Sequence, residues 1–178
     1  DQGRISLARD AREKVVYDVI TAIALCHNVT PVIDEGKRIF QASSPDEIAL
    51  VQTIESLGMK LVTRDQDTIS IEDAGGSMEN YDILANFPFS SESKRMGIIL
   101  KNKSTNKIVF YLKGADTVMK DRVPQRQRGH LLDTCETLAT EGLRTLVIAE
   151  KHLTEEEFQN WKVKYDEATQ SLVDRQEC

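Results

Sequence analysis

One short stretch of the chain, residues 87–96, combines residue types that could bind a nucleotide. It places the aromatic residues Phe87 and Phe89 beside hydroxyl side chains and the adjacent cations Lys94 and Arg95. Aromatic rings stack on other flat rings, and cations form charge-assisted hydrogen bonds with anions. The stretch therefore suits a ligand that has an aromatic ring and a negative charge. The alternative is that both aromatic residues belong to the core and that the cations form a solvated edge.

Two further cations stand where apolar segments begin or end. Lys113 and Gly114 follow the apolar segment 108–112 and precede a short expected helix, whose N-terminus favours anions. Glycine also permits a close backbone approach. Arg144 stands near the start of the apolar segment 143–149, and a buried charge without a partner is costly, so we expect Arg144 to be paired or to reach an edge. The simpler interpretations are an exposed lysine in a turn and an ordinary ion pair.

A carboxylate precedes the second expected helix. Residues 44–47 read Ser-Pro-Asp-Glu and lead into apolar residues at helical spacing. We predict that Ser44 is the N-cap, that Pro45 is the first helical residue, and that Glu47 returns to the backbone as the second half of a capping box. Capping alone would explain all four residues.

Apolar spacing predicts the elements that position these residues. Helices are expected over 10–27, 45–57 and 130–140, with a short one ending near residue 119. A long helix is expected from residue 155, where Thr154 and Glu157 have the spacing of a capping box. A basic loop is expected over 122–129. Strands are expected as a hairpin over 32–41 and as runs over 60–62, 68–71, 81–87, 96–101, 108–112 and 143–149. Consecutive strands without helices between them imply an α+β fold, a mainly antiparallel β-sheet flanked by helices, in a single domain over residues 1–178.

The composition excludes several classes of protein. The net charge of −6 argues against a broad nucleic-acid footprint. The three cysteines are odd in number and widely spaced, so the Cys26-His27 pair is expected to be structural, with no metal bound. Neither common glycine-rich phosphate loop is present, and no apolar run approaches the roughly 18 residues that span a bilayer. The chain begins with Asp1, and we expect a fragment of a longer protein.

Four motifs, in order along the chain, resemble the nucleotide-binding domain of a P-type ATPase. The combination is similar to the type IV group, the phospholipid-translocating flippases, and residues 24–31 resemble the branch that acts without a β-subunit. The motifs are Ser44-Pro45-Asp46-Glu47, Phe89-Ser90-Ser91 with Lys94-Arg95-Met96, Lys113-Gly114-Ala115-Asp116, and Gly142-Leu143-Arg144-Thr145-Leu146.

The resemblance implies an ATP site. In it Phe89 stacks on adenine, Glu47 approaches the adenine edge, and Ser91 and Lys94 line the nucleotide near the stacking ring. Lys113 forms the floor, and Arg144 reaches towards ribose and phosphate. The implied set is Glu47, Phe89, Ser91, Lys94, Lys113, Gly114 and Arg144.

The resemblance also implies partners. These partners are ATP and the phosphorylation and actuator domains of the same polypeptide. Phospholipid is contacted only through a membrane domain, and nucleic acid is not a partner. Mg²⁺ is bound outside this chain. The phosphorylated aspartate and its motif are absent from the chain, so it has no catalytic residue and is not expected to hydrolyse ATP alone. The implied location is the cytosolic side of an endomembrane, of the Golgi or endosome, or of the plasma membrane.

The alternative is a non-catalytic interaction or regulatory module. In that case the basic loop from Arg122 to Arg128 and the acidic helix from Glu155 are docking surfaces for other domains or for a regulatory tail.

Overall fold

The computed structural model describes residues 2–170. Its helices are α1 (Gln2–Leu25), α2 (Pro45–Ser56), α3 (Asp116–Met119), the 3-10 helix η1 (Lys120–Arg122), α4 (Gln125–Thr140) and α5 (Glu155–Gln170). Its strands are β1 (Thr30–Asp34), β2 (Lys37–Gln41), β3 (Lys60–Arg64), β4 (Thr68–Glu72), β5 (Met78–Phe87), β6 (Arg95–Asn102), β7 (Ile108–Gly114) and β8 (Val147–Leu153).

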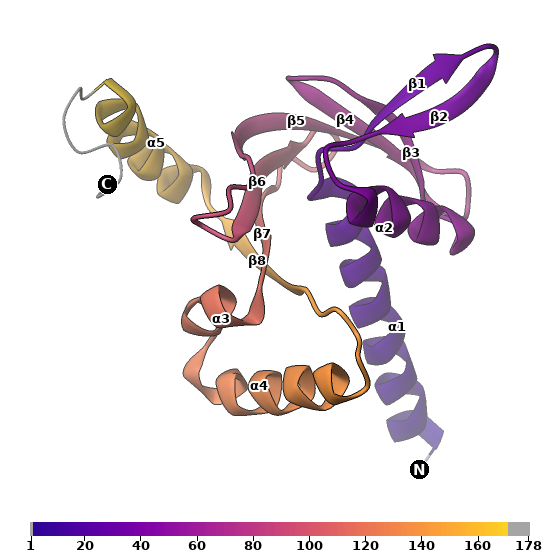
Figure 1. The fold of residues 1–178 in the computed structure, drawn as a ribbon, viewed down its shortest axis with the longest axis vertical. Helices are drawn as coiled ribbons and strands as arrows, with labels where there is room; N and C mark the ends of the chain where they lie inside the picture. Colours follow the sequence, from indigo (N-terminus) through magenta and orange to yellow (C-terminus); the bar gives the residue numbers. More distant parts are fainter. Residues whose placement is uncertain (1, 171–178) are drawn as a thin grey trace.

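Six of these strands form one antiparallel sheet in the order β3-β4-β5-β6-β7-β8 (Figure 1). Each strand pairs with its neighbour in the sequence, so short turns and, before β8, helices α3 and α4 connect them. The hairpin β1-β2 is a separate two-stranded sheet that turns at Glu35 and Gly36, both with positive φ. The predicted α+β fold with a mainly antiparallel sheet is confirmed.

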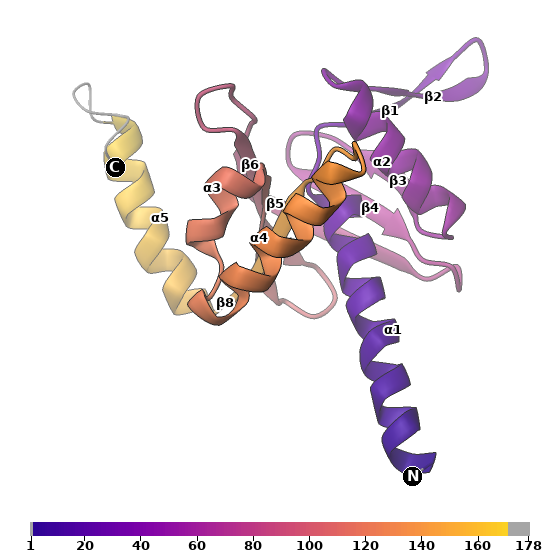
Figure 2. The same ribbon diagram turned by 60° about the horizontal axis from the view of Figure 1, so that its bottom comes forward.

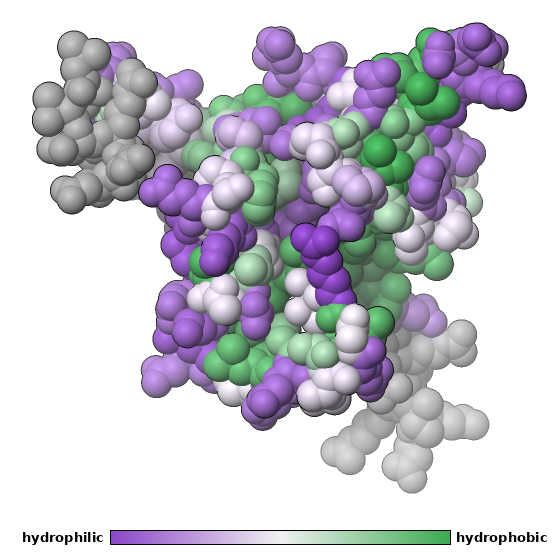
Figure 3. Space-filling view, viewed as in Figure 1, coloured by the Kyte–Doolittle hydropathy of each residue, from purple (hydrophilic) through white to green (hydrophobic). Residues whose placement is uncertain are grey.

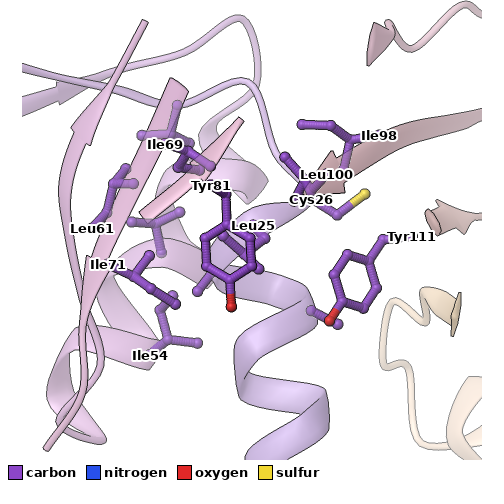
Figure 4. Packing of buried hydrophobic residues seen from close by; sticks show 14 of the residues in the cluster. Leu25, Cys26, Ile54, Leu61, Ile69, Ile71, Tyr81, Ile98, Leu100 and Tyr111 are labelled. Carbon is purple, nitrogen blue, oxygen red and sulfur yellow. The ribbon is translucent and has the colours of Figure 1, made fainter. Parts of the chain in front are cut away.

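The main core lies on one face of the sheet, beneath α1 and α2. Leu25 of α1 and Ile54 of α2 pack against strand residues such as Ile98 and Leu100, all fully or almost fully buried. Figure 4 shows these side chains converging from the helices and from the sheet. Cys26 and His27 follow the last turn of α1 and are also buried, so the C-terminal end of the helix lies in this core.

The opposite face of the sheet carries α5 and, further along the strands, α3 and α4 (Figure 2). The predicted capping box of α5 is confirmed: the Thr154 backbone N–H donates to Glu157 Oε2 at 2.9 Å, and the Glu157 backbone N–H donates to Thr154 Oγ1 at 3.1 Å. Trp161 packs edge-on against Phe87, with ring centroids 5.9 Å apart. Phe87 is half-buried and packs against this smaller core cluster, whereas Phe89 is exposed, so the interpretation that placed both rings in the core holds only for Phe87 and only in part.

Three predicted elements differ from the observed ones. The segment predicted as a buried strand over 143–149 becomes regular only at Val147, and Leu143 and Leu146 are 53% and 49% exposed. The chain is still crossing from α4 to the sheet edge there, so its apolar residues have no strand beside them. The predicted basic loop over 122–129 is largely helical, because α4 begins directly after Pro124 with a polar, solvent-facing turn.

The first helix is also longer than predicted, and its apolar stripe is not a core face along its whole length. Val15, Val16 and Val19 are 61%, 58% and 42% exposed, whereas Ala22, Ala24 and Leu25 are buried. Only the last turns of α1 lie over the sheet, because the helix projects away from it towards the N-terminus (Figure 1).

Candidate functional site

A cavity of about 320 Å³ lies where the start of β6 and the end of β7 meet the N-terminus of α2 and the segment before β8. This volume is at the small end of the roughly 300–1,000 Å³ found for small-molecule sites. The cavity brings together six of the seven residues predicted for the site: Glu47, Phe89, Lys94, Lys113, Gly114 and Arg144. Ser91 lies in the exposed turn before β6 and does not line it.

Strand register places two of the predicted segments together. In the β6-β7 pair, Arg95 stands opposite Gly114 and Met96 opposite Lys113. The pairing continues past the strand ends, where the Ala115 backbone N–H donates to the Lys94 carbonyl oxygen at 3.1 Å. A Cβ atom on Gly114 would lie only 2.8 Å from that same carbonyl oxygen, so a side chain there would push the two segments apart. The predicted close backbone approach at Gly114 is therefore present.

An ion pair forms the floor of the cavity. Lys113 Nζ donates to Glu47 Oε1 at 2.5 Å, and the two side chains are only 6% and 13% exposed. The other carboxylate oxygen of Glu47 accepts a hydrogen bond from the Asn28 backbone N–H at 2.8 Å. Glu47 thus joins three segments that are far apart in the sequence: the end of α1, the start of α2 and the end of β7.

The predicted capping box at the start of α2 is wrong. Ser44 is the N-cap residue and Pro45 opens the helix, as expected, but Ser44 makes no side-chain capping hydrogen bond. Glu47 points away from the helix end to Lys113 and Asn28. A buried ammonium without a counter-charge costs far more free energy than a helix-end N–H exposed to water, so the ion pair takes the carboxylate.

The surroundings of this floor are positively charged. Arg64, at the end of β3, is close enough to Glu47 for an electrostatic interaction, and its Nη1 is buried without a hydrogen-bond partner among the described residues. Burial lowers the pKa of Arg64. Arg64 and Lys113 are therefore two cations near one carboxylate, Glu47. Sequence patterns gave no indication of Arg64, because a single arginine at a strand end is common.

Burial keeps the neighbouring Cys26 and His27 neutral. Burial, with a contribution from nearby Arg64, lowers the pKa of His27 to about 3, and burial raises the pKa of Cys26 to about 12. The ring of His27 accepts at Nδ1 from the Val29 backbone N–H at 2.9 Å, so its Nε2 donates to the Ala24 carbonyl oxygen at 2.8 Å. Both residues therefore close the end of α1, in agreement with the structural role expected for them.

The rim of the cavity is exposed and carries both apolar and charged side chains. Phe89 is 59% exposed although it is a large aromatic residue. Arg144 is 82% exposed, and its Nη1 lies 2.8 Å from Asp46 Oδ2. Arg144 is thus paired at an edge, one of the two outcomes that its predicted position allowed. In Figure 3 the middle of this side of the molecule is hollowed, with both hydrophobic and hydrophilic residues facing the hollow.

Comparison with known proteins identifies the family. The sequence model of the family described as "P-type ATPase, cytoplasmic domain N" matches residues 15–175. The chain belongs to this family. The match confirms the resemblance that its four motifs indicated, and the relatives described next support the type IV group within it.

Several phospholipid-transporting ATPases are similar to this N domain. "Probable phospholipid-transporting ATPase IIB" of Bos taurus is 44% identical over 178 residues, which cover 90% of this chain and 16% of that protein. "Phospholipid-transporting ATPase NEO1" of Saccharomyces cerevisiae is 42% identical over 161 residues, which cover 90% of this chain and 14% of that protein. "Probable phospholipid-transporting ATPase tat-5" of Caenorhabditis elegans is 42% identical over 173 residues, which cover 95% of this chain and 16% of that protein. The chain therefore spans about a sixth of the length of these relatives.

Within residues 2–170, no helix is both long enough and apolar enough to cross a bilayer.

Proposed function

We propose that this N domain binds ATP in the cavity between α2, β6 and β7 and presents it to the phosphorylation domain of a phospholipid-transporting P-type ATPase. The observation that carries the proposal is one arrangement: an exposed aromatic ring, Phe89, at the rim of a cavity whose floor holds the buried cation Lys113. An exposed aromatic ring beside a cavity offers a face on which a base can stack, and the cation attracts a phosphate-bearing ligand.

The cavity suits the base of ATP, and its mouth suits the ribose and phosphates. At the rim, Phe89 stacks on adenine, and Lys94 lies along the nucleotide near that ring, with Ser91 in the exposed turn outside the cavity. At the floor, Glu47 holds Lys113 in place, and its carboxylate oxygens retain free lone pairs for the amino group of adenine. Arg144, which pairs with Asp46 across the cavity mouth, turns to the ribose and phosphates.

Binding by this site is weak. One base stacked on an aromatic ring contributes roughly 1–3 kcal/mol, each charge-assisted hydrogen bond adds roughly 1.5–3 kcal/mol, and association costs on the order of 4–15 kcal/mol. The balance gives a dissociation constant of roughly millimolar to high micromolar. Weak binding suits a domain that delivers ATP to a second domain and then releases ADP.

The chemistry of the whole ATPase takes place outside this chain. The γ-phosphate passes to an aspartate of the phosphorylation domain, Mg²⁺ binds there, and phospholipid is moved by the membrane domain. The N domain contributes binding and orientation of the nucleotide. Action without a β-subunit and the kind of membrane stay predictions from the sequence.

The test is a titration of the 178-residue chain with ATP, in which binding is monitored through the amide chemical shifts in NMR spectra. We expect shifts around Phe89, Lys113 and Arg144, and we expect Phe89→Ala to abolish them while the melting temperature changes little. Tyr17→Ala is the matched control, because Tyr17 is another exposed aromatic residue, 42% exposed, whose hydroxyl donates to Glu79 of β5, away from the cavity.

Two results would count against the proposal. One is the absence of shifts at several times the expected dissociation constant. The other is a large fall in melting temperature for Phe89→Ala, since it would mean that the ring is part of the core.

A further inference from the structure

A cavity larger than the nucleotide cavity lies on the other face of the sheet. It has a volume of about 570 Å³ and lies between the end of η1 and the side of α5. Successive residues of a strand point to opposite faces. Lys113 of β7 lines the nucleotide cavity, whereas its neighbour Leu112 and also Phe110 line this one. Figure 2 shows α3 and α5 on this face, in front of the sheet.

We call this feature the η1-α5 groove. A second cavity of about 450 Å³ continues it beneath α5 and shares Phe87, Phe110, Lys151 and Trp161 with it. The aromatic rings are half-buried and in contact with one another: Phe87 lies 6.0 Å from Phe110 and 5.9 Å from Trp161, measured between ring centroids. The groove thus has an aromatic floor that is extended along the sheet.

Cations surround this aromatic floor. Arg95 and Arg122 line the groove, and neither forms an ion pair with any residue in the described part of the chain; each guanidinium donates only to a backbone carbonyl, of Ser93 and Val118 respectively. Lys151 also lines the groove and pairs with Glu157 at 3.2 Å. Glu150 is also in the lining, but it stands opposite Tyr111 of β7, so its carboxylate points to the other face of the sheet. The charged part of the lining that faces the groove consists of Arg95, Arg122 and Lys151. It is therefore net positive in a chain whose net charge is −6.

We propose that the η1-α5 groove is a docking site for an acidic protein segment that carries an aromatic or large aliphatic side chain. The apolar side chain packs on Phe110 and Trp161, and flanking carboxylates pair with Arg95 and Arg122, whose planar guanidinium groups suit carboxylates. The elongated shape favours an extended segment over a compact ligand. This function does not require ATP binding, because the two sites lie on opposite faces of the sheet and share only Met96 among their lining residues.

The location agrees with the alternative that the sequence left open. The basic segment from Arg122 and the helix from Glu155 were both candidate docking surfaces, and one residue of each, Arg122 and Trp161, lines the groove. The first turn of α5 adds Glu157, which lines the adjoining cavity and pairs with Lys151.

The test uses intrinsic fluorescence. Trp161 is the single tryptophan of the chain and lines the groove, whereas no tryptophan lines the nucleotide cavity. The probe is a synthetic peptide of glutamate residues around a central phenylalanine. We expect it to change the emission of Trp161 saturably, and we expect the same peptide with glutamine in place of glutamate to bind at least tenfold more weakly.

Three variants separate docking in the groove from general charge attraction. Arg122→Glu should weaken binding by about tenfold, because a favourable charge becomes a repulsive one. Arg126→Glu makes the same charge change on an exposed residue outside the lining and should leave the affinity within about twofold. Glu150→Gln removes a carboxylate on the other face of the sheet and should also leave the affinity within about twofold.

Several outcomes would overturn the proposal. These are no change in Trp161 emission at millimolar peptide, equal effects of Arg122→Glu and Arg126→Glu, or equal binding of the glutamine peptide. Displacement of the peptide by ATP, or its loss in Phe89→Ala, would place it in the nucleotide cavity instead. Binding of anionic phosphatidylserine vesicles or of an oligonucleotide, with the same dependence on Arg122 but no peptide binding, would assign the groove to a different partner.

Discussion

Replacement of Glu47 by glutamine is expected to destabilise the fold and to weaken ATP binding at the same time. The change leaves Lys113 buried beside a neutral amide. It also offers the Asn28 backbone N–H a weaker acceptor than a carboxylate. A residue that only capped α2 would cost about 1 kcal/mol on removal, so the size of the loss separates the two roles.

The geometry gives the magnitude. Two unit charges at 2.5 Å attract by roughly 6–7 kcal/mol at an effective dielectric constant of about 20, and desolvation of both groups offsets most of this. Removing one partner of a buried pair costs about 3–5 kcal/mol, and glutamine, which still accepts one hydrogen bond, belongs near 3 kcal/mol. That is a large part of the roughly 5–15 kcal/mol that stabilises an ordinary domain.

The assay is a double-mutant cycle of Glu47→Gln and Lys113→Met, measured by urea unfolding with far-UV circular dichroism. Since the double variant no longer holds Lys113 as a buried charge without its partner, we expect it to be more stable than the two single losses predict, by about 1–3 kcal/mol. The control is the same cycle on Asp82 and Lys103, an ion pair at 3.0 Å whose side chains are 45% and 46% exposed. Its coupling should be about 0–1 kcal/mol. Equal couplings in the two cycles would refute the reasoning.

Two further predictions concern residues around the cavity. Asp46→Asn releases Arg144 for the phosphates, so ATP should bind roughly twofold to fivefold more tightly by the same chemical-shift titration; weaker binding would mean that Asp46 itself holds the ligand. The pKa of His27 falls from 6.5 to about 3 on folding, so the unfolded chain binds the extra proton. The stability that comes from neutral His27 is present above about pH 6.5 and is lost as the pH falls towards 3, at up to about 1.4 kcal/mol per pH unit. His27→Gln should lack this contribution, so its deficit in unfolding free energy should be smaller at pH 5 than at pH 7; an unchanged deficit would contradict the neutral, buried ring.

Local sequence patterns were enough to predict much of the scaffold. The hairpin of β6 and β7 followed from two apolar runs around a polar turn, and the start of α5 followed from the capping box at Thr154. These features depend on residues within a few positions of one another. The four motifs likewise indicated the family before any contact was known, because their order along the chain is a property of the sequence alone.

Long-range contacts determined the features that local sequence patterns did not predict. The spacing around Glu47 is that of a capping box, and only the fold brings Lys113, 66 residues away, within reach of its carboxylate. The apolar run from Leu143 resembles a buried strand, but no strand lies beside the chain there until it pairs with β7 at Val147.

The η1-α5 groove also depends on long-range contacts. Arg122 and Trp161 have no relation in the sequence, and they face one cavity because β8 returns the chain to the sheet edge between them. The sequence by itself determined most of the helices and strands and the family that the chain resembles, since short-range spacing encodes both. The tertiary structure alone decided which charges are buried together and which remain without a partner, since burial depends on what packs from elsewhere in the chain.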